Sequence, residues 1–204
     1  NISIIDPLLT LPLLAFVILS IAKKTNTFAR VGVVWVLLYL MLGLIQRDRA
    51  IEAGEELALK RSHSPIRLEA KPSFGNLLLW KIVYEQAGFF YVDAVRIGTA
   101  TKVFEGTRTE KLDLTKHFPW LEINSQQSKD IKRFLWFSNN YLGIDEQNKN
   151  KIIDVRYSML PDEIDALWGI EVSKTASRED HIKWVTSREM DAKDRDKFWS
   201  MLFK

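Results

Sequence analysis

The stretch LLTLPLLAFVILSIA at residues 8–22 and the stretch VGVVWVLLYLMLGLI at residues 31–45 contain no charged side chain. Both are apolar on every face, which is typical of helices surrounded by lipid or by other helices. A helix needs about 20 residues to cross the hydrocarbon layer, so the first run reaches that length only with its flanks. The two runs predict an N-terminal transmembrane helical hairpin; the alternative is a buried hairpin inside a soluble protein.

Asp6 and Pro7 mark the start of the first helix, because Asp is a favoured N-cap and proline is favoured at the first helical position. The Asp6 carboxylate would then stand at the entrance of an apolar segment, where an ionisable group is costly and is a functional candidate. Two interpretations stay open. Asp6 is either a catalytic or metal-binding carboxylate, or it only caps the helix at the membrane surface.

Beyond the second apolar run the helical pattern continues as a polar stalk to about Arg61. Pro65 ends it, because the residue before a proline avoids the helical region. The sequence therefore predicts three parts: a transmembrane hairpin at residues 1–46, a helical stalk or linker at 47–64 and a water-facing domain at 65–204.

The predicted water-facing domain consists mainly of short β-rich runs. Residues 85–88 separate two of them, 77–84 and 89–97, and Gly88 suits the positive φ of a hairpin turn. Further strands are expected at residues 67–71, 103–104, 141–144, 152–158, 166–173 and 181–187, and helices at 125–138 and 191–203. Strands interrupted by occasional helices predict an α+β fold on a mainly antiparallel sheet.

The composition excludes several classes of function. The chain of 204 residues has 29 basic and 26 acidic residues, a net charge of +3, and no basic run interleaved with aromatics, so nucleic acid is not an expected partner. A modest basic surplus suits a protein that lies against anionic lipid. The absence of cysteine excludes disulfides, thiolate metal sites and cysteine nucleophiles.

Few other residues indicate chemistry. His63, His117 and His181 are far apart and lack metal-site spacing, so each is expected to be structural or solvated. Asp93 lies in a predicted strand, where a salt bridge is a better interpretation than catalysis. Most of the tryptophans are expected in the core, and some at the membrane interface, where indole is favoured.

Four strings together carry a resemblance to a known family: IIDPLLTLPLL at residues 4–14, YLMLGLIQ at 39–46, KPSFGNLLLW at 71–80 and YVDAVR at 91–96. They resemble the membrane-bound metal-dependent hydrolases, the YdjM-like inner-membrane family of bacteria. The order and spacing fit over residues 2–98. The family's His-Arg-Gly-x-Thr-His-Ser motif is not in this sequence, so the chain is similar to the C-terminal portion of such a protein.

The resemblance implies an integral protein of the bacterial inner membrane that hydrolyses its substrate with a divalent metal ion, for which zinc is one candidate. It implies that most metal ligands, and further transmembrane helices that partner this hairpin, lie upstream of Asn1, and that only Asp6 of this chain joins the site. No metal is expected on this fragment, and its substrate is not indicated. The alternative is a non-enzymatic, membrane-anchored β domain that binds a peptide, a glycan or a lipid headgroup.

The side of the membrane on which the domain lies is not fixed by the sequence. Lys23, Lys24 and Arg30 in the short loop favour a cytoplasmic loop and an external domain. Arg47 and Arg49, just after the second run, favour the reverse.

Overall fold

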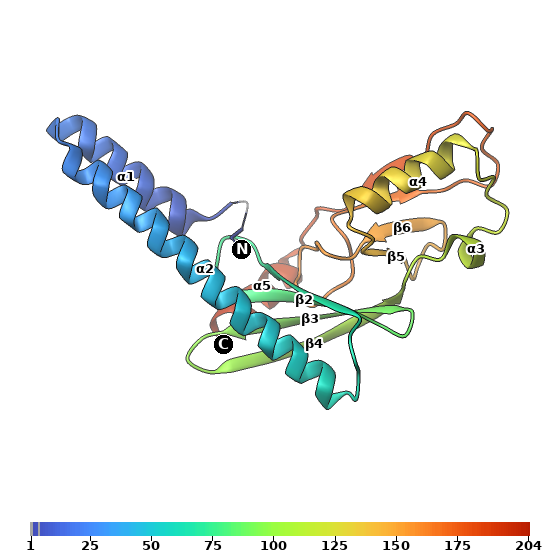
Figure 1. Ribbon diagram of the computed structural model, residues 1–204, viewed down its shortest axis with the longest axis horizontal. Helices are drawn as coiled ribbons and strands as arrows, with labels where there is room; N and C mark the ends of the chain where they lie inside the picture. Colours follow the sequence, from blue (N-terminus) through green and yellow to red (C-terminus); the bar gives the residue numbers. More distant parts are fainter. Residues whose placement is uncertain (1, 4) are drawn as a thin grey trace.

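The computed structural model describes residues 2, 3 and 5–204 and confirms the predicted α+β fold. Its first helix, α1 (Pro7–Lys23), begins as predicted, with Asp6 as the N-cap and Pro7 in the first turn. Lys24 takes a left-handed conformation with φ of 49° and ends α1, and Thr25 caps the start of α2 (Asn26–Lys60). The two helices lie side by side as a hairpin (Figure 1).

The hairpin leaves its apolar side chains largely uncovered. Large aliphatic residues such as Leu11, Ile21, Val33 and Leu37 are exposed. By length and composition, α2 is one helix near the N-terminus that is long and apolar enough to cross a membrane, whereas α1, with 17 residues, is a shorter apolar helix. That both helices cross the bilayer stays a prediction.

The first sheet is antiparallel, with its four strands in sequence order. The strands are β1 (Arg67–Pro72), β2 (Leu79–Gln86), β3 (Phe89–Ile97) and β4 (Thr101–Glu110). The predicted turn between β2 and β3 is confirmed, because Ala87 and Gly88 both have positive φ, at 49° and 78°. Two such residues in a two-residue connection match the twist of the flanking strands.

The polar half of α2 packs on this sheet, which differs from the predicted stalk. Ala50 and Ala58 are fully buried against sheet residues such as Ile82. Gly54 lies so close to the sheet that an added Cβ would stand 2.8 Å from Cγ2 of Ile82. One face of residues 47–60 therefore belongs to the core of the domain, and the same helix continues directly into the apolar half.

A second antiparallel sheet of four strands follows in the C-terminal half. Its strands are β5 (Leu142–Ile144), β6 (Lys151–Asp154), β7 (Trp168–Glu171) and β8 (Lys183–Thr186). The helices of this half are α3 (Leu114–His117), α4 (Gln126–Phe137) and α5 (Ala192–Phe203). The helices α4 and α5 lie where the sequence predicts them, α3 was not predicted, and the last three strands are shorter than expected.

The two sheets are joined by a shared core and by one arginine. Val83, Phe90 and Val92 of the first sheet pack with Tyr141 and other residues of the second half. The Arg67 guanidinium, from β1, stacks 3.9 Å above the ring of Tyr141 and donates to the carbonyls of Asn139 and Asn140. Helix α5 packs on the first sheet through Phe198, Met201 and Leu202.

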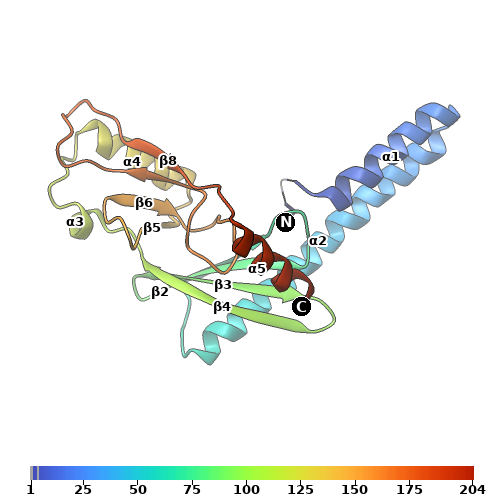
Figure 2. The ribbon, with the colours of Figure 1, turned by 180° about the vertical axis from the view of Figure 1, so that it is seen from behind.

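The whole molecule is an open V (Figure 1). The distal part of the α1–α2 hairpin forms one arm, and the second sheet with α4 forms the other. The first sheet lies at the base of the V, crossed by the polar half of α2. Seen from behind, the arrangement is the same, with the N-terminal segment between the two arms (Figure 2).

Candidate functional site

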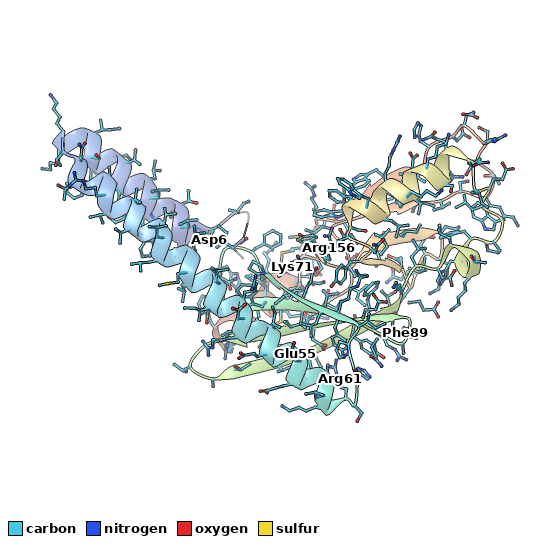
Figure 3. The ribbon with its side chains drawn as sticks, viewed as in Figure 1. Asp6, Glu55, Arg61, Lys71, Phe89 and Arg156 are labelled. Carbon is cyan, nitrogen blue, oxygen red and sulfur yellow. The ribbon has the colours of Figure 1, made fainter. Side chains whose placement is uncertain are left out.

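A cavity of about 530 Å³ lies at the notch of the V, where the N-terminal segment, the β1–β2 region and the loop after β6 meet. Its wall includes four basic side chains, which are Lys71, Lys81, Arg156 and Arg188. None of the described residues that line it carries a carboxylate. The rest is largely apolar or aromatic: Ile2, Ile5, Phe74, Met159, Leu167 and Trp168. Figure 3 shows Lys71 and Arg156 in the notch, with Asp6 on its hairpin side.

On the hairpin side of the cavity, the segment before α1 is hydrogen-bonded to the connection between β1 and β2. Gly75 donates its backbone N–H to Ser3 Oγ over 3.3 Å, and its φ of 68° is one that favours glycine. Asn76 fixes the same connection, because its Oδ1 accepts from the backbone N–H groups of Leu78 and Leu79. The cavity wall is therefore built partly from the segment that leads directly into α1.

Lys81 is the most perturbed group of the site. It lies in β2, only 4% exposed, and its Nζ donates to Ser158 Oγ and to the Glu163 carbonyl, each over 2.6 Å. Burial lowers the pKa of Lys81 to about 7, because desolvation disfavours the charged amine. Four nearby carboxylates oppose that shift without bonding the amine: Asp162, Asp154, Glu163 and Asp165. Lys81 therefore titrates near neutral pH.

The carboxylates around the cavity are largely occupied by other cations. Asp154, which is completely buried, binds Arg156 through two bonds of 2.9 and 2.7 Å and also accepts from the Trp168 indole. Burial alone would lower the pKa of Arg156, but the bonds to Asp154 outweigh it and raise the pKa, so Arg156 stays charged. Lys197 binds both Asp162 and Glu163 over 2.7 Å.

Two cations of the cavity wall are left without a carboxylate. Lys81 bonds only neutral oxygens, and exposed Arg188 has no ion-pair partner among the residues that the structure describes. Lys71, by contrast, pairs with Glu69 over 2.6 Å. The wall thus combines apolar surface with two basic side chains that no carboxylate bonds directly, which suits a ligand that has an anionic head and an apolar body.

Asp6, the site residue that the sequence predicts, lies at the start of α1 and is 3% exposed. Its carboxylate accepts the Tyr39 hydroxyl over 2.7 and 2.8 Å and the backbone N–H of Leu9 over 3.3 Å. The helix cap is therefore confirmed, while the catalytic or metal-binding role stays a prediction. Within residues 2, 3 and 5–204 no group of three or more His, Asp or Glu side chains is placed to hold a metal.

The remaining sequence candidates are separate from the cavity. Asp93 makes the expected salt bridge, with two bonds of 2.7 and 2.9 Å to Arg61. The three histidines bond three different partners: His63 bonds Tyr84, His117 bonds Glu110, and His181 bonds Asp130. They do not meet at one site.

Sequence reasoning missed the cavity, because its basic residues come from three distant parts of the chain: the paired strands β1 and β2, the loop after β6 and the segment after β8. The one local signal was Lys81, the only charge in the otherwise apolar run LLLWKIVY at residues 77–84. A lysine inside an apolar strand is buried on one face of the sheet, and a buried lysine requires a polar environment.

The fold and the cavity together define a class: an α+β protein with an apolar helical hairpin and a basic, partly apolar cavity at its base. No family model, no curated protein and no solved structure matches the chain. The resemblance to YdjM-like proteins therefore remains a prediction from the four sequence strings.

Proposed function

We propose that the chain is anchored in a membrane by the α1–α2 hairpin and that the cavity binds the phosphate-bearing headgroup of an anionic amphiphile. The observation that carries this proposal is the pair Lys81 and Arg188, two cations without a carboxylate on a wall that is otherwise largely apolar. Following the resemblance, the membrane is the bacterial inner membrane, and both hairpin helices enter it.

The electrostatics of the cavity support an anion. An anion that approaches Lys81 would stabilise the ammonium form against its desolvation, so binding and protonation favour each other. Interactions of this kind are stronger in a partly buried site than in water, because the local dielectric is lower. Arg188 adds a permanent charge, and Arg156 stays charged beside it.

The position of the cavity supports an amphiphile taken from the bilayer. Ile2 and Ile5 line it and lead directly into α1, the first helix of the hairpin. A lipid in the adjacent leaflet would reach the basic residues with its headgroup while its chains stay beside the exposed aliphatic side chains of the hairpin. A free phosphate ion would use the same cations but gain nothing from the apolar wall.

The test measures which lipids stay bound to the full chain when it is released from nanodiscs. The nanodiscs are made of zwitterionic lipid with or without phosphatidylglycerol. We expect anionic lipid to be enriched on the protein, as measured by native mass spectrometry, and this enrichment to be reduced in Lys81→Met and in Arg188→Gln. Lys149→Gln, an exposed lysine outside the cavity, is the matched control and should retain the lipid. Displacement by inorganic phosphate alone at low concentration would indicate a free anion as the ligand. Equal retention in all variants would contradict the proposal.

A metal-dependent hydrolase is the second candidate, and the buried Asp6 carboxylate at the hairpin favours it. We expect a longer protein with the upstream helices to bind stoichiometric divalent metal, and this chain alone to bind none. Asp6→Asn in the longer protein should lower the metal content measured by plasma emission spectrometry. Unchanged metal content and unchanged function in that variant would leave the binding module as the better account.

A further inference from the structure

One face of the second arm carries large aromatic side chains in solvent. Trp136 is 85% exposed, and Phe137 and Trp184 are about half exposed, at 53% and 50%. Phe137 and Trp184 are neighbours, since Phe134 contacts both with its ring, and Trp136 directly precedes Phe137 on α4. An exposed cluster of large apolar side chains often marks a site of interaction with a protein or a membrane.

The same face is basic. Lys129, Lys132 and Arg133 are exposed on α4. Lys129, Arg133 and Trp136 follow the spacing that places side chains on one side of a helix. The one acid of α4, Asp130, pairs with Arg133 over 3.2 Å and with His181 over 2.8 Å, so Lys129 and Lys132 carry the excess charge. We call this surface, made of Lys129, Lys132, Arg133, Trp136, Phe137 and Trp184, the α4 face.

The arms of the V place this surface on the hairpin side of the molecule. In Figure 1, α4 lies along the upper edge of the second arm, above β5 and β6, and the tip of the hairpin points upward and away from this arm. The end of α2 and the first sheet lie on the opposite side. A bilayer that contains the hairpin would therefore meet α4 before it meets the strands β5 and β6 beneath it.

We infer that the α4 face rests on the interface of an anionic membrane and forms a second contact beside the hairpin. This inference depends on the proposed membrane anchorage but not on the cavity ligand. Indole and phenyl rings are favoured at the level of the headgroups, and basic side chains near them attract anionic lipid. Two contacts would fix the tilt of the domain and keep the notch of the V against the leaflet.

Because the chain has no cysteine, single cysteines can carry an environment-sensitive fluorophore without further changes. We would label Trp136→Cys on the α4 face, Leu37→Cys on the exposed apolar part of α2 and Glu105→Cys on the first sheet, each in the full chain. The labelled proteins are reconstituted in vesicles with and without phosphatidylglycerol, and quenching by lipids brominated at different depths is measured. Circular dichroism confirms that each variant is folded.

We expect the label at position 37 to be quenched by deep bromines, the label at 136 by shallow bromines with a blue-shifted emission, and the label at 105 by none. Removing phosphatidylglycerol, or adding Lys132→Gln and Arg133→Gln, should release position 136 while position 37 stays quenched. A quenched position 37 with position 136 fully in water would overturn the inference and leave the anchorage standing. If position 37 is not quenched, the anchorage itself is wrong, and the inference falls with it.

Discussion

At the scale of single residues, the most informative side chain is Lys81. A lysine is expensive to bury, and here its two hydrogen-bond partners are neutral oxygens of Ser158 and Glu163. The lowered pKa follows from burial, while the carboxylates that would restore it are bonded to Arg156 and Lys197. This arrangement supports the proposed binding of an anion beside Lys81.

The pKa of Lys81 predicts how stability changes with pH. Its folded value of about 7 lies below the value of about 10.4 expected in the unfolded chain. Between these values the unfolded state binds more protons, so the contribution of Lys81 to the free energy of unfolding rises with pH. Lys81→Met should flatten this rise between pH 7 and 10, which thermal unfolding in detergent at several pH values would measure. An unchanged slope would mean that Lys81 is not buried as described.

The same titration predicts the pH dependence of binding. Anionic lipid should bind more tightly below pH 7, where the Lys81 amine is protonated, and more weakly above it. The Lys81→Met variant should bind weakly at every pH, whereas Arg188→Gln should keep the pH dependence at lower affinity. Lipid titrations followed by native mass spectrometry at pH 6 and pH 8.5 would separate these outcomes. Affinity that is independent of pH in the unmodified chain would argue against a direct contact with Lys81.

Arg61 and Asp93 offer a third prediction at this scale, away from the cavity. Asp93 is 1% exposed and is bonded by both Arg61 nitrogens and by the Gly106 N–H. Arg61→Met should cost about 3–5 kcal/mol, because it leaves a buried charge without its partner. The double variant Arg61→Met with Asp93→Asn should be more stable than Arg61→Met alone. Equal losses in unfolding experiments on both variants would show that the pair is not coupled.

At the scale of elements, local signals predicted the helices better than the site. The Asp6 cap, the Pro7 start and the β2–β3 turn each depend on neighbouring residues, and all three are confirmed. The packing of residues 47–60 was missed, because that half of α2 faces the sheet with small residues such as Ala50 and Gly54. Small residues give a weak hydrophobic pattern, although they allow the closest approach of a helix to a sheet.

Gly54 provides the test of that packing. Gly54→Ala places a methyl group 2.8 Å from Ile82 Cγ2, so α2 and the sheet must separate locally, at a cost of about 1–3 kcal/mol. The control is Gly98→Ala, whose added Cβ would meet only the Ala100 carbonyl at 3.6 Å. Thermal unfolding should show a lower midpoint for the first variant only. A Gly54→Ala protein as stable as the unmodified chain would contradict the close contact.

At the scale of the whole molecule, the cavity exists only because distant segments meet. Its wall comes from segments that are far apart in the sequence: the N-terminal segment, the lysine of β2, the loop after β6 and Arg188. No sequence pattern links these segments. The arrangement of the two sheets also depends on contacts between distant residues, through Arg67 and the shared core around Tyr141. The α+β class was predictable from local sequence patterns, whereas the V shape and its notch were not.

The central claim is that lipid surrounds the apolar half of the hairpin. The proposed roles of the cavity and of the α4 face both depend on a bilayer beside them. The most direct measurement is analytical ultracentrifugation of the purified full chain with detergent and after its removal. We predict a defined protein–detergent particle in the first case and aggregation in the second, with recovery upon addition of vesicles. A stable monomer of 23.7 kDa in buffer alone would contradict the account.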